Sequence, residues 1–264
     1  MIKLGISTAC LYPMLTEEAF AQIARSGVQC CEVFFNADCE LEDAFTRELA
    51  RRSASLGVPI VSVHPYTAAL EPVYFFSGYP RRTEDGFEQY KKYFHAMNIL
   101  GARYLIFHGD AKNNLFSQGA GFEHMSRLCE MAKSFGVQIA HENVSRCKSS
   151  SLSYLEKLAA QMPEMRFVLD IKQAVRSQVN PFDIINLLGN RIVHLHLSDH
   201  SAAGDCLAPG KGTFDFESLF SRLREVHFSG CGVIELYRAN FGDFGELTQA
   251  YGYLLSKLRP ASFQ

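Results

Sequence analysis

Several short apolar stretches of the sequence each end on a polar side chain that can take up or release a proton. In residues 191–197, His194 and His196 alternate with apolar residues, and Asp199 follows. Residues two apart on a β-strand point to the same face, so this stretch predicts two imidazoles side by side. Hydrogen-bonded core histidines would explain one such strand alone. However, the pattern recurs, and the terminal polar residues are Glu32, His64, His108, Glu142, Asp170, His196 and Glu235.

Four of these residues have the chemistry of a divalent-metal site. Three carboxylates and one imidazole would come from successive strands, and such oxygen and nitrogen donors suit Mn²⁺, Mg²⁺, Co²⁺ or Zn²⁺. Without a cation, three facing carboxylates would repel one another and raise the pKa of at least one. A salt bridge to a lysine or arginine would explain any one carboxylate, whereas the full set predicts one bound metal. The predicted ligands are Glu142, Asp170, His196 and Glu235.

The strands that would carry these residues alternate with helices along the chain. Each unit contains an amphipathic stretch, a glycine, a short apolar strand and a terminal polar residue. One helix is expected to open at Thr16, which would act as its cap. The expected strands cover residues 2–6, 28–35, 58–63, 103–107, 137–141, 166–169, 191–197 and 231–234. The clearest other helices cover residues 43–56, 84–100, 153–161, 216–226 and 244–258.

This alternation predicts the fold class. Eight short apolar strands, each followed by a helix, indicate an α/β protein with a parallel sheet buried on both faces. The number of strands favours a closed (β/α)8 TIM barrel over an open doubly wound sheet. No Gly-rich G-x-G-x-x-G turn follows the first strand, so a dinucleotide-binding fold has no support. Without a linker or low-complexity run, residues 1–264 are expected to form one domain whose strand ends converge at one mouth.

The composition excludes several classes of protein. The 264 residues are 47% hydrophobic and 20% charged, with a formal net charge of −2. Since there is no basic excess, binding to nucleic acid is not expected. The eight cysteines include no C-x-x-C pair and indicate reduced thiols. We find no secretory segment and no apolar run of the ~18 residues that span a bilayer, so a cytoplasmic protein without membrane contact is expected.

The strand-end residues also carry a family resemblance that extends over nearly the whole chain. Its most specific marks are Glu142-Asn143, Asp170, the strand with His194, His196 and then Asp199, the turn at residues 209–212 with Asp215, and Glu235. The sequence resembles the xylose isomerase-like TIM barrels, a superfamily of sugar or sugar-phosphate isomerases and epimerases and of endonuclease IV-type enzymes. The resemblance implies that Glu142, Asp170, His196 and Glu235 bind one divalent metal. It also implies that Glu142 and Glu235 exchange protons with the substrate.

The chemistry of such a site predicts the reaction. A divalent metal that chelates a ketose carbonyl and its neighbouring hydroxyl acidifies the C–H between them by stabilising an enediolate. One glutamate would take the proton and the other would return it, giving an isomerase or epimerase of a sugar or sugar phosphate. The same site could instead expel a β-hydroxyl, and keto-inositol-type and dehydroshikimate-type dehydratases resemble this fold too. A barrel that binds a sugar without turnover is a third alternative.

A metal-dependent phosphodiesterase of the endonuclease IV type would use three zinc ions and more ligands. Two positions depart from its pattern, because Gln173 stands in the D-x-x-H motif that begins at Asp170, and Leu207 in the D-x-H motif that begins at Asp205. Without these two imidazoles, at least one zinc position should lack ligands and bind zinc weakly or not at all. This argues against a role in DNA repair. The residues that could match the three-zinc set are His64, His108, Glu142, Asp170, His196, Asp205 and Glu235.

Other residues near the strand ends are predicted to contact the substrate. His64 and His108 are expected to line the pocket and to bind substrate hydroxyls. Gln173 replaces a histidine that commonly contacts substrate in the isomerases, and it can still donate a hydrogen bond. Cations of the strand-end loops could bind a phosphate or carboxylate, or could simply be solvated; these are Lys172, Arg176, Lys211 and Arg238.

The surroundings of the predicted site are less specific. His141 and His194 are expected to orient neighbouring side chains. Four aromatic residues could form an apolar wall over the sugar carbons, although core packing is their more frequent role: Phe34, Phe35, Tyr66 and Phe107. Related barrels often form homo-oligomers, but no stretch of this sequence marks an interface.

Overall fold

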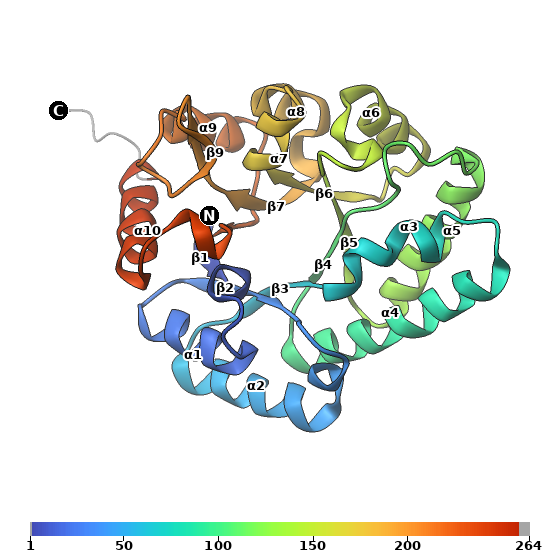
Figure 1. Ribbon diagram of the computed structural model, residues 1–264, viewed down its shortest axis with the longest axis horizontal. Coiled ribbons are helices and arrows are strands. Elements are labelled where there is room, and N and C mark those ends of the chain that lie inside the picture. Colours follow the sequence, from blue (N-terminus) through green and yellow to red (C-terminus); the bar gives the residue numbers. More distant parts are fainter. Residues whose placement is uncertain (1, 259–264) are drawn as a thin grey trace.

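A closed barrel of eight parallel strands forms the centre of the computed structural model, which describes residues 2–258 (Figure 1). Each strand pairs with the next one along the chain, and the last pairs with the first. The (β/α)8 TIM barrel predicted from the sequence is therefore confirmed. The barrel strands are β1 Lys3–Ser7, β2 Cys30–Phe34, β3 Ile60–His64, β4 Tyr104–Phe107, β5 Gln138–Glu142, β6 Arg166–Asp170, β7 Ile192–Leu197 and β10 Cys231–Ile234.

Helices surround these strands in Figure 1 and cover their outer face. The main helices are α1 Thr16–Arg25, α2 Asp43–Leu56, α4 Pro80–Leu100, α5 Gln118–Ser134, α6 Leu152–Gln161, α8 Pro181–Leu188, α9 Phe216–Glu225 and α10 Phe244–Leu258. Within residues 2–258, no helix is long and apolar enough to cross a membrane.

Additional short elements follow the strand ends and were not predicted. They are the helices α3 Glu71–Phe75 and α7 Ile171–Arg176, the hairpin β8 Asp199–Ser201 with β9 Gly204–Leu207, and 3-10 turns at Thr8–Leu11, Asp38–Leu41, Tyr66–Leu70, Lys148–Ser150 and Arg238–Asn240. A further 3-10 turn, Gly189–Arg191, joins α8 to the start of β7. They matter here because several of them carry side chains that reach the strand-end cavity.

Two predicted helix starts differ from the structure. Thr16 is the first helical residue of α1 rather than its cap, because its hydroxyl donates to the buried carboxylate of Glu40 at 3.0 Å. Helix α4 begins at Pro80, four residues before the predicted start at residue 84. A proline suits this position because backbone N–H groups in the first helical turn have no partner within the helix, so the N–H that proline lacks costs no hydrogen bond.

The core is divided between two regions. A large cluster of apolar side chains fills the space between the strands and the helices. A smaller one contains Ile106, Ala140 and Val168, from three consecutive strands. Because side chains alternate along a strand, Ala140 and Val168 point to the same face as Glu142 and Asp170. This small apolar cluster therefore lies on the face of the sheet that carries the polar strand ends.

Candidate metal centre

The four residues predicted as metal ligands come together at the strand ends. One ligand atom from each of Glu142, Asp170, His196 and Glu235 lies within 4.8 Å of the others. His196 Nδ1 is 3.4 Å from Glu142 Oε1, 3.7 Å from Asp170 Oδ2 and 3.5 Å from Glu235 Oε2. Four strands separated by long stretches of sequence thus supply one compact acidic cluster around a single imidazole.

Backbone pairing fixes the relative positions of these side chains. Asp170 of β6 is in register with His196 of β7, and the N–H of Glu235 donates to the carbonyl of Leu197 at 3.2 Å. The side chain of Asn143 bridges β5 to β6, because its Nδ2 donates to the carbonyl of Asp170 and its Oδ1 accepts the N–H of the same residue. Asn143, which follows Glu142 in the sequence, therefore holds two of the predicted ligands in place.

The cluster fits a divalent cation. Asp170 Oδ2 and His196 Nδ1 are buried without a hydrogen-bond partner, an arrangement that costs free energy unless another group binds there. Ligands about 2.1 Å from a tetrahedral ion are separated from one another by about 3.4 Å, close to the spacings around His196. Oxygen and nitrogen donors suit Mn²⁺, Mg²⁺, Co²⁺ or Zn²⁺.

Charge and burial give the three carboxylates different pKa shifts. Burial raises the pKa of Asp170, and the positive charge of Lys172 only partly offsets this effect. Burial also acts to raise the pKa of Glu142, but His108 and His196 outweigh it and lower the pKa well below its usual value. His196 and Lys172 likewise outweigh burial at Glu235, whose pKa is lowered. These shifts favour the ionised forms of Glu142 and Glu235.

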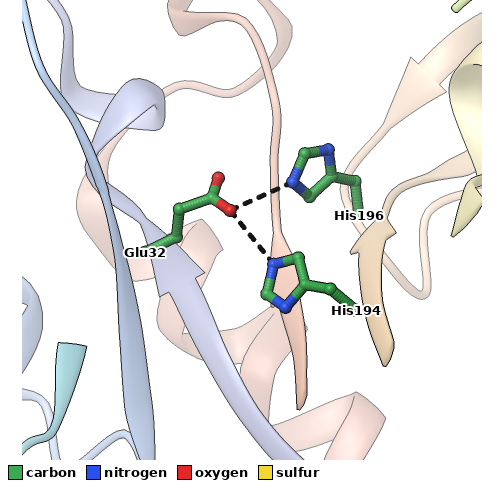
Figure 2. A group of neighbouring side chains, drawn as sticks. All are labelled: Glu32, His194 and His196. Atoms are coloured by element: carbon green, nitrogen blue, oxygen red, sulfur yellow. Dashed lines mark hydrogen bonds and ion pairs between the residues drawn. The ribbon is translucent and has the colours of Figure 1, made fainter. Parts of the chain in front are cut away.

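Inside the barrel, the carboxylate of Glu32 contacts the imidazoles of both His194 and His196 (Figure 2). Its Oε2 lies 3.0 Å from His194 Nε2 and 3.2 Å from His196 Nε2, and it also accepts the hydroxyl proton of Ser62 at 2.8 Å. Burial acts to raise the pKa of Glu32, but the two imidazoles lower it well below its usual value. A proton on His196 Nε2 directs the lone pair of Nδ1 toward the acidic cluster, as metal-binding histidines require.

A second histidine pair lies beside Glu142. His64 Nε2 is 2.9 Å from His108 Nε2, which is 3.0 Å from Glu142 Oε2, and Arg146 donates to His108 Nδ1 at 2.9 Å. Since Nδ1 of His108 accepts, its proton must sit on Nε2, facing His64 and Glu142. Burial, with a contribution from His108, lowers the pKa of His64 to about 4. Arg146 was missed in the sequence, where its only signal is its position four residues after Glu142.

The end of β4 is also held from outside the barrel. The buried carboxylate of Glu71, on α3, accepts the N–H of His108 at 2.8 Å and the N–H of Gly109 at 2.6 Å. The hydroxyl of Tyr90 donates to the other oxygen of Glu71. Burial raises the pKa of Glu71 to about 7.

Lys172 lies against the acidic cluster rather than free in a loop. Its Nζ is 2.9 Å from Glu235 Oε2 and 3.5 Å from Asp170 Oδ2, and only 3% of its side chain is exposed. The ammonium group also lies 4.7 Å from the ring centre of Tyr237. Burial acts to lower the pKa of Lys172, but Asp170 and Glu235 raise it well above its usual value. This lysine is thus a permanent positive charge beside the predicted ligands.

A cavity of about 610 Å³ opens above the cluster. Glu142 and Glu235 reach its wall, together with five residues predicted to contact substrate: His64, His108, Lys172, Gln173 and Arg238. The two other predicted cations lie elsewhere. Arg176 is paired with Asp205 at 2.6 Å, and Lys211 is exposed in its turn.

Other residues singled out in the sequence have structural partners. Asp199 accepts four backbone N–H groups and thereby organises the loop at residues 200–214. His141 is fully buried and contacts the ring of Phe107 edge to face. Phe34 and Tyr66 line the cavity, whereas Phe35 and Phe107 belong to the core. Asp205 is held by Arg176 and does not join the acidic cluster, whereas His64, His108 and Glu142 form a second group whose ligand atoms lie within 4.8 Å of one another.

The fold and the strand-end cluster define a TIM barrel with a candidate divalent-metal centre. Residues 20–259 match the family model described as "Xylose isomerase-like TIM barrel". The match spans most of the chain, so the protein belongs to this family. The resemblance found in the sequence is thereby confirmed.

Individual relatives are distant. An uncharacterized protein of Mycobacterium leprae is 23% identical over 264 residues, which cover 89% of each chain. An inosose dehydratase of Clostridium beijerinckii is 26% identical over 131 residues, 42% of this chain and 44% of the relative. Among solved structures, a D-tagatose 3-epimerase-like protein has a TM-score of 0.82 with 20% identity and covers 97% of both chains. The IOLI protein with a binding zinc atom has a TM-score of 0.77 with 17% identity, covering 97% of this chain and 96% of that one.

Proposed function

We propose that the protein is a divalent-metal-dependent isomerase or epimerase of a sugar or sugar phosphate. The observation that carries the proposal is that two of the four residues of the acidic cluster line the cavity and the other two do not. Glu142 and Glu235 line the cavity, whereas Asp170 and His196 are not among its lining residues. Two ionised carboxylates at the surface of a cavity can exchange protons with a bound substrate, while the other two ligands hold the metal.

The chain's own residues would carry out the proton transfer. A divalent cation held by Glu142, Asp170, His196 and Glu235 would polarise a substrate carbonyl and so acidify the neighbouring C–H. One of the two cavity-facing glutamates takes that proton, and the other delivers one to the opposite face or to the neighbouring carbon. Groups of this kind typically contribute about 10²–10⁴-fold each.

The cavity wall supplies groups that could hold the substrate. His108 can donate from Nε2, and Gln173 keeps its amide N–H groups while its Oε1 accepts from Ser145. Arg238 lines the cavity too, although its guanidinium donates to the carbonyls of Phe241 and Gly242. Lys172 and His64 complete the predicted substrate contacts at this cavity. Arg176 and Lys211 do not line the cavity, so their predicted contact with substrate has no such support.

Proton exchange with solvent tests the proposal. The protein would be incubated with Mn²⁺ and ketohexoses such as D-tagatose and D-fructose, and with their phosphates, in D₂O. Proton NMR should show loss of the signal next to the carbonyl and the appearance of an epimer or isomer. Glu142→Gln and Glu235→Gln should each abolish formation of the epimer or isomer, and the variant that lacks the proton-abstracting glutamate should also abolish the exchange. Exchange that persists in both variants while metal stays bound would contradict the proposal.

A dehydratase is the second candidate, and the similarity to an inosose dehydratase favours it. The same proton abstraction would then be followed by departure of a hydroxyl from the carbon beyond, with net loss of water. Mass spectrometry of the products distinguishes the two reactions, because epimerisation and isomerisation conserve mass and dehydration removes 18 Da. A keto-polyol would be the substrate to test.

A further inference from the structure

Lys172 is placed by the same chain segment that supplies a predicted metal ligand. Asp170 caps α7 with Oδ1, which accepts the N–H of Gln173 at 2.8 Å, and leaves Oδ2 for the acidic cluster. Lys172 is the second residue of this helix, so its side chain starts one turn or less from Asp170. The helix cap thus fixes the lysine beside the cluster.

The ammonium group contacts two carboxylate oxygens that the metal would also use. Asp170 Oδ2 and Glu235 Oε2 are 3.7 Å and 3.5 Å from His196 Nδ1, and the same two oxygens are 3.5 Å and 2.9 Å from Lys172 Nζ. The contacts of Asp170 are fully buried, and those of Glu235 are partly buried, since 12% of its side chain is exposed. A charge at this depth is screened by water much less than an exposed one.

The charges of the cluster balance only when Lys172 is included. Three carboxylates contribute −3, a divalent ion would contribute +2, and Lys172 contributes the remaining +1. Without the metal, the groups that can carry positive charge against both Asp170 and Glu235 are Lys172 and His196, and a bound metal requires the imidazole to be neutral, which leaves Lys172 as the remaining cation. Without the lysine, the metal-free cluster would place three facing carboxylates in a buried site.

We propose that Lys172 is a built-in counter-charge that shares Asp170 and Glu235 with the divalent metal. This inference rests on the metal site of the proposed function. Lys172 stabilises the metal-free site and, by repelling the divalent ion and holding two of its ligand oxygens, lowers its affinity. The metal of this protein is therefore readily exchanged, and the chain folds before it is loaded.

A metal titration of the full-length protein tests this inference. Protein stripped with a chelator would be titrated with Mn²⁺ and with Zn²⁺, by calorimetry or by competition with a metal-binding dye. Lys172→Met removes the charge and keeps an unbranched side chain. Its affinity for both ions is expected to rise at least tenfold.

Lys148→Met is the matched control. Lys148 also pairs with a buried carboxylate after a barrel strand, since its Nζ is 2.6 Å from Asp110 Oδ2, but Asp110 is not one of the predicted ligands. Its metal affinity should stay within threefold of the parent protein. Lys172→Arg keeps the charge and should not tighten metal binding.

If Lys172→Met folds too poorly for a metal titration, thermal unfolding with and without Mn²⁺ still tests the inference. Without metal, Lys172→Met should unfold at a lower temperature than the parent, and Mn²⁺ should raise its unfolding temperature by more. A variant that folds only when Mn²⁺ is present also supports the inference. Unchanged or weaker metal affinity in folded Lys172→Met overturns it.

The two proposals fail separately. If Lys172→Met tightens metal binding but no ketose or keto-polyol is turned over, the proposed reaction is wrong and the counter-charge stands. If ketose turnover is found but Lys172→Met binds metal as the parent does, the counter-charge is wrong alone. Absence of Mn²⁺ and Zn²⁺ binding in every variant overturns both.

Discussion

Glu32 Oε2 lies 3.2 Å from His196 Nε2, on the side of the ring opposite the acidic cluster. The two residues come from β2 and β7, which are not neighbours in the barrel, so the contact crosses its interior. Because Glu32 accepts a hydrogen bond from Nε2 of His196, the ring proton lies on Nε2, and the lone pair of Nδ1 is free to bind a metal. Glu32 thus positions a predicted metal ligand without itself belonging to the four-residue cluster.

Replacing Glu32 with Gln should weaken metal binding. The amide can donate to Nε2 of His196, which would shift the ring proton to Nδ1 and block the ligand atom. Loss of such a supporting group typically costs 10–100-fold in metal affinity. A dye-competition titration with Zn²⁺ measures this change.

Glu40→Gln is the control for that variant, because Glu40 is also a buried carboxylate with hydrogen-bond donors, but its partners are Thr16 and Asn36. Its metal affinity should match that of the parent. Equal affinity in Glu32→Gln and the parent would rule out the positioning role.

Glu71 should make stability depend on pH. Its pKa is about 7 in the folded protein, because burial raises it from 4.5. A group whose folded pKa lies above its unfolded value contributes its full stabilisation below the unfolded pKa and loses it as the pH rises through the folded pKa. The parent should therefore lose up to about 3 kcal/mol of unfolding free energy relative to Glu71→Gln between pH 5 and pH 8.

Urea unfolding of both proteins in the presence of a chelator, at several pH values, measures that difference. Taking the difference between parent and variant removes the contribution of other titrating groups. A difference that is constant, or that grows in favour of the parent as the pH rises, would show that Glu71 is not held with a raised pKa.

Gly5 should tolerate no side chain. A Cβ added to this residue of β1 would lie 2.0 Å from the carbonyl oxygen of Cys30, a backbone atom of the adjacent strand. Gly5→Ala should therefore destabilise the protein by about 3 kcal/mol, the upper end of the range for overpacking. Gly252→Ala is the control, since Gly252 lies within α10 with nothing within 4 Å of its added Cβ. The control should gain about 0.5–1 kcal/mol in urea unfolding, and a similar effect of both changes would refute this assignment.

The barrel and the four-residue cluster could be predicted because both follow from local patterns. Short apolar strands alternating with helices specify a parallel sheet, and the ends of its strands meet at one mouth. Glu142 and Asp170 are the last residues of their strands, so their convergence needed no knowledge of loop structure. The alternation that placed His194 and His196 on one face is also seen in their shared contact with Glu32.

Other features depend on contacts between distant segments and could not be predicted. The sequence predicts Glu32 as a strand-end carboxylate, but it is the third of the five residues of β2, and its partner His196 is 164 residues away. Lys172 has a long flexible side chain, so its sequence position does not reveal whether it faces substrate or Asp170 and Glu235. Thr16 has the residue type of a helix cap, but a tertiary contact with Glu40 takes its hydroxyl.

The metal content of the protein tests the central claim most directly. Protein purified without chelator, and again after soaking in Mn²⁺ or Zn²⁺, would be analysed by elemental mass spectrometry alongside Asp170→Ala. One divalent ion per chain is predicted for the parent, and Asp170→Ala should lose it because two carboxylates and one imidazole remain. Two or three zinc ions per chain, no metal even after soaking, or full occupancy in Asp170→Ala would contradict a single metal centre at Glu142, Asp170, His196 and Glu235.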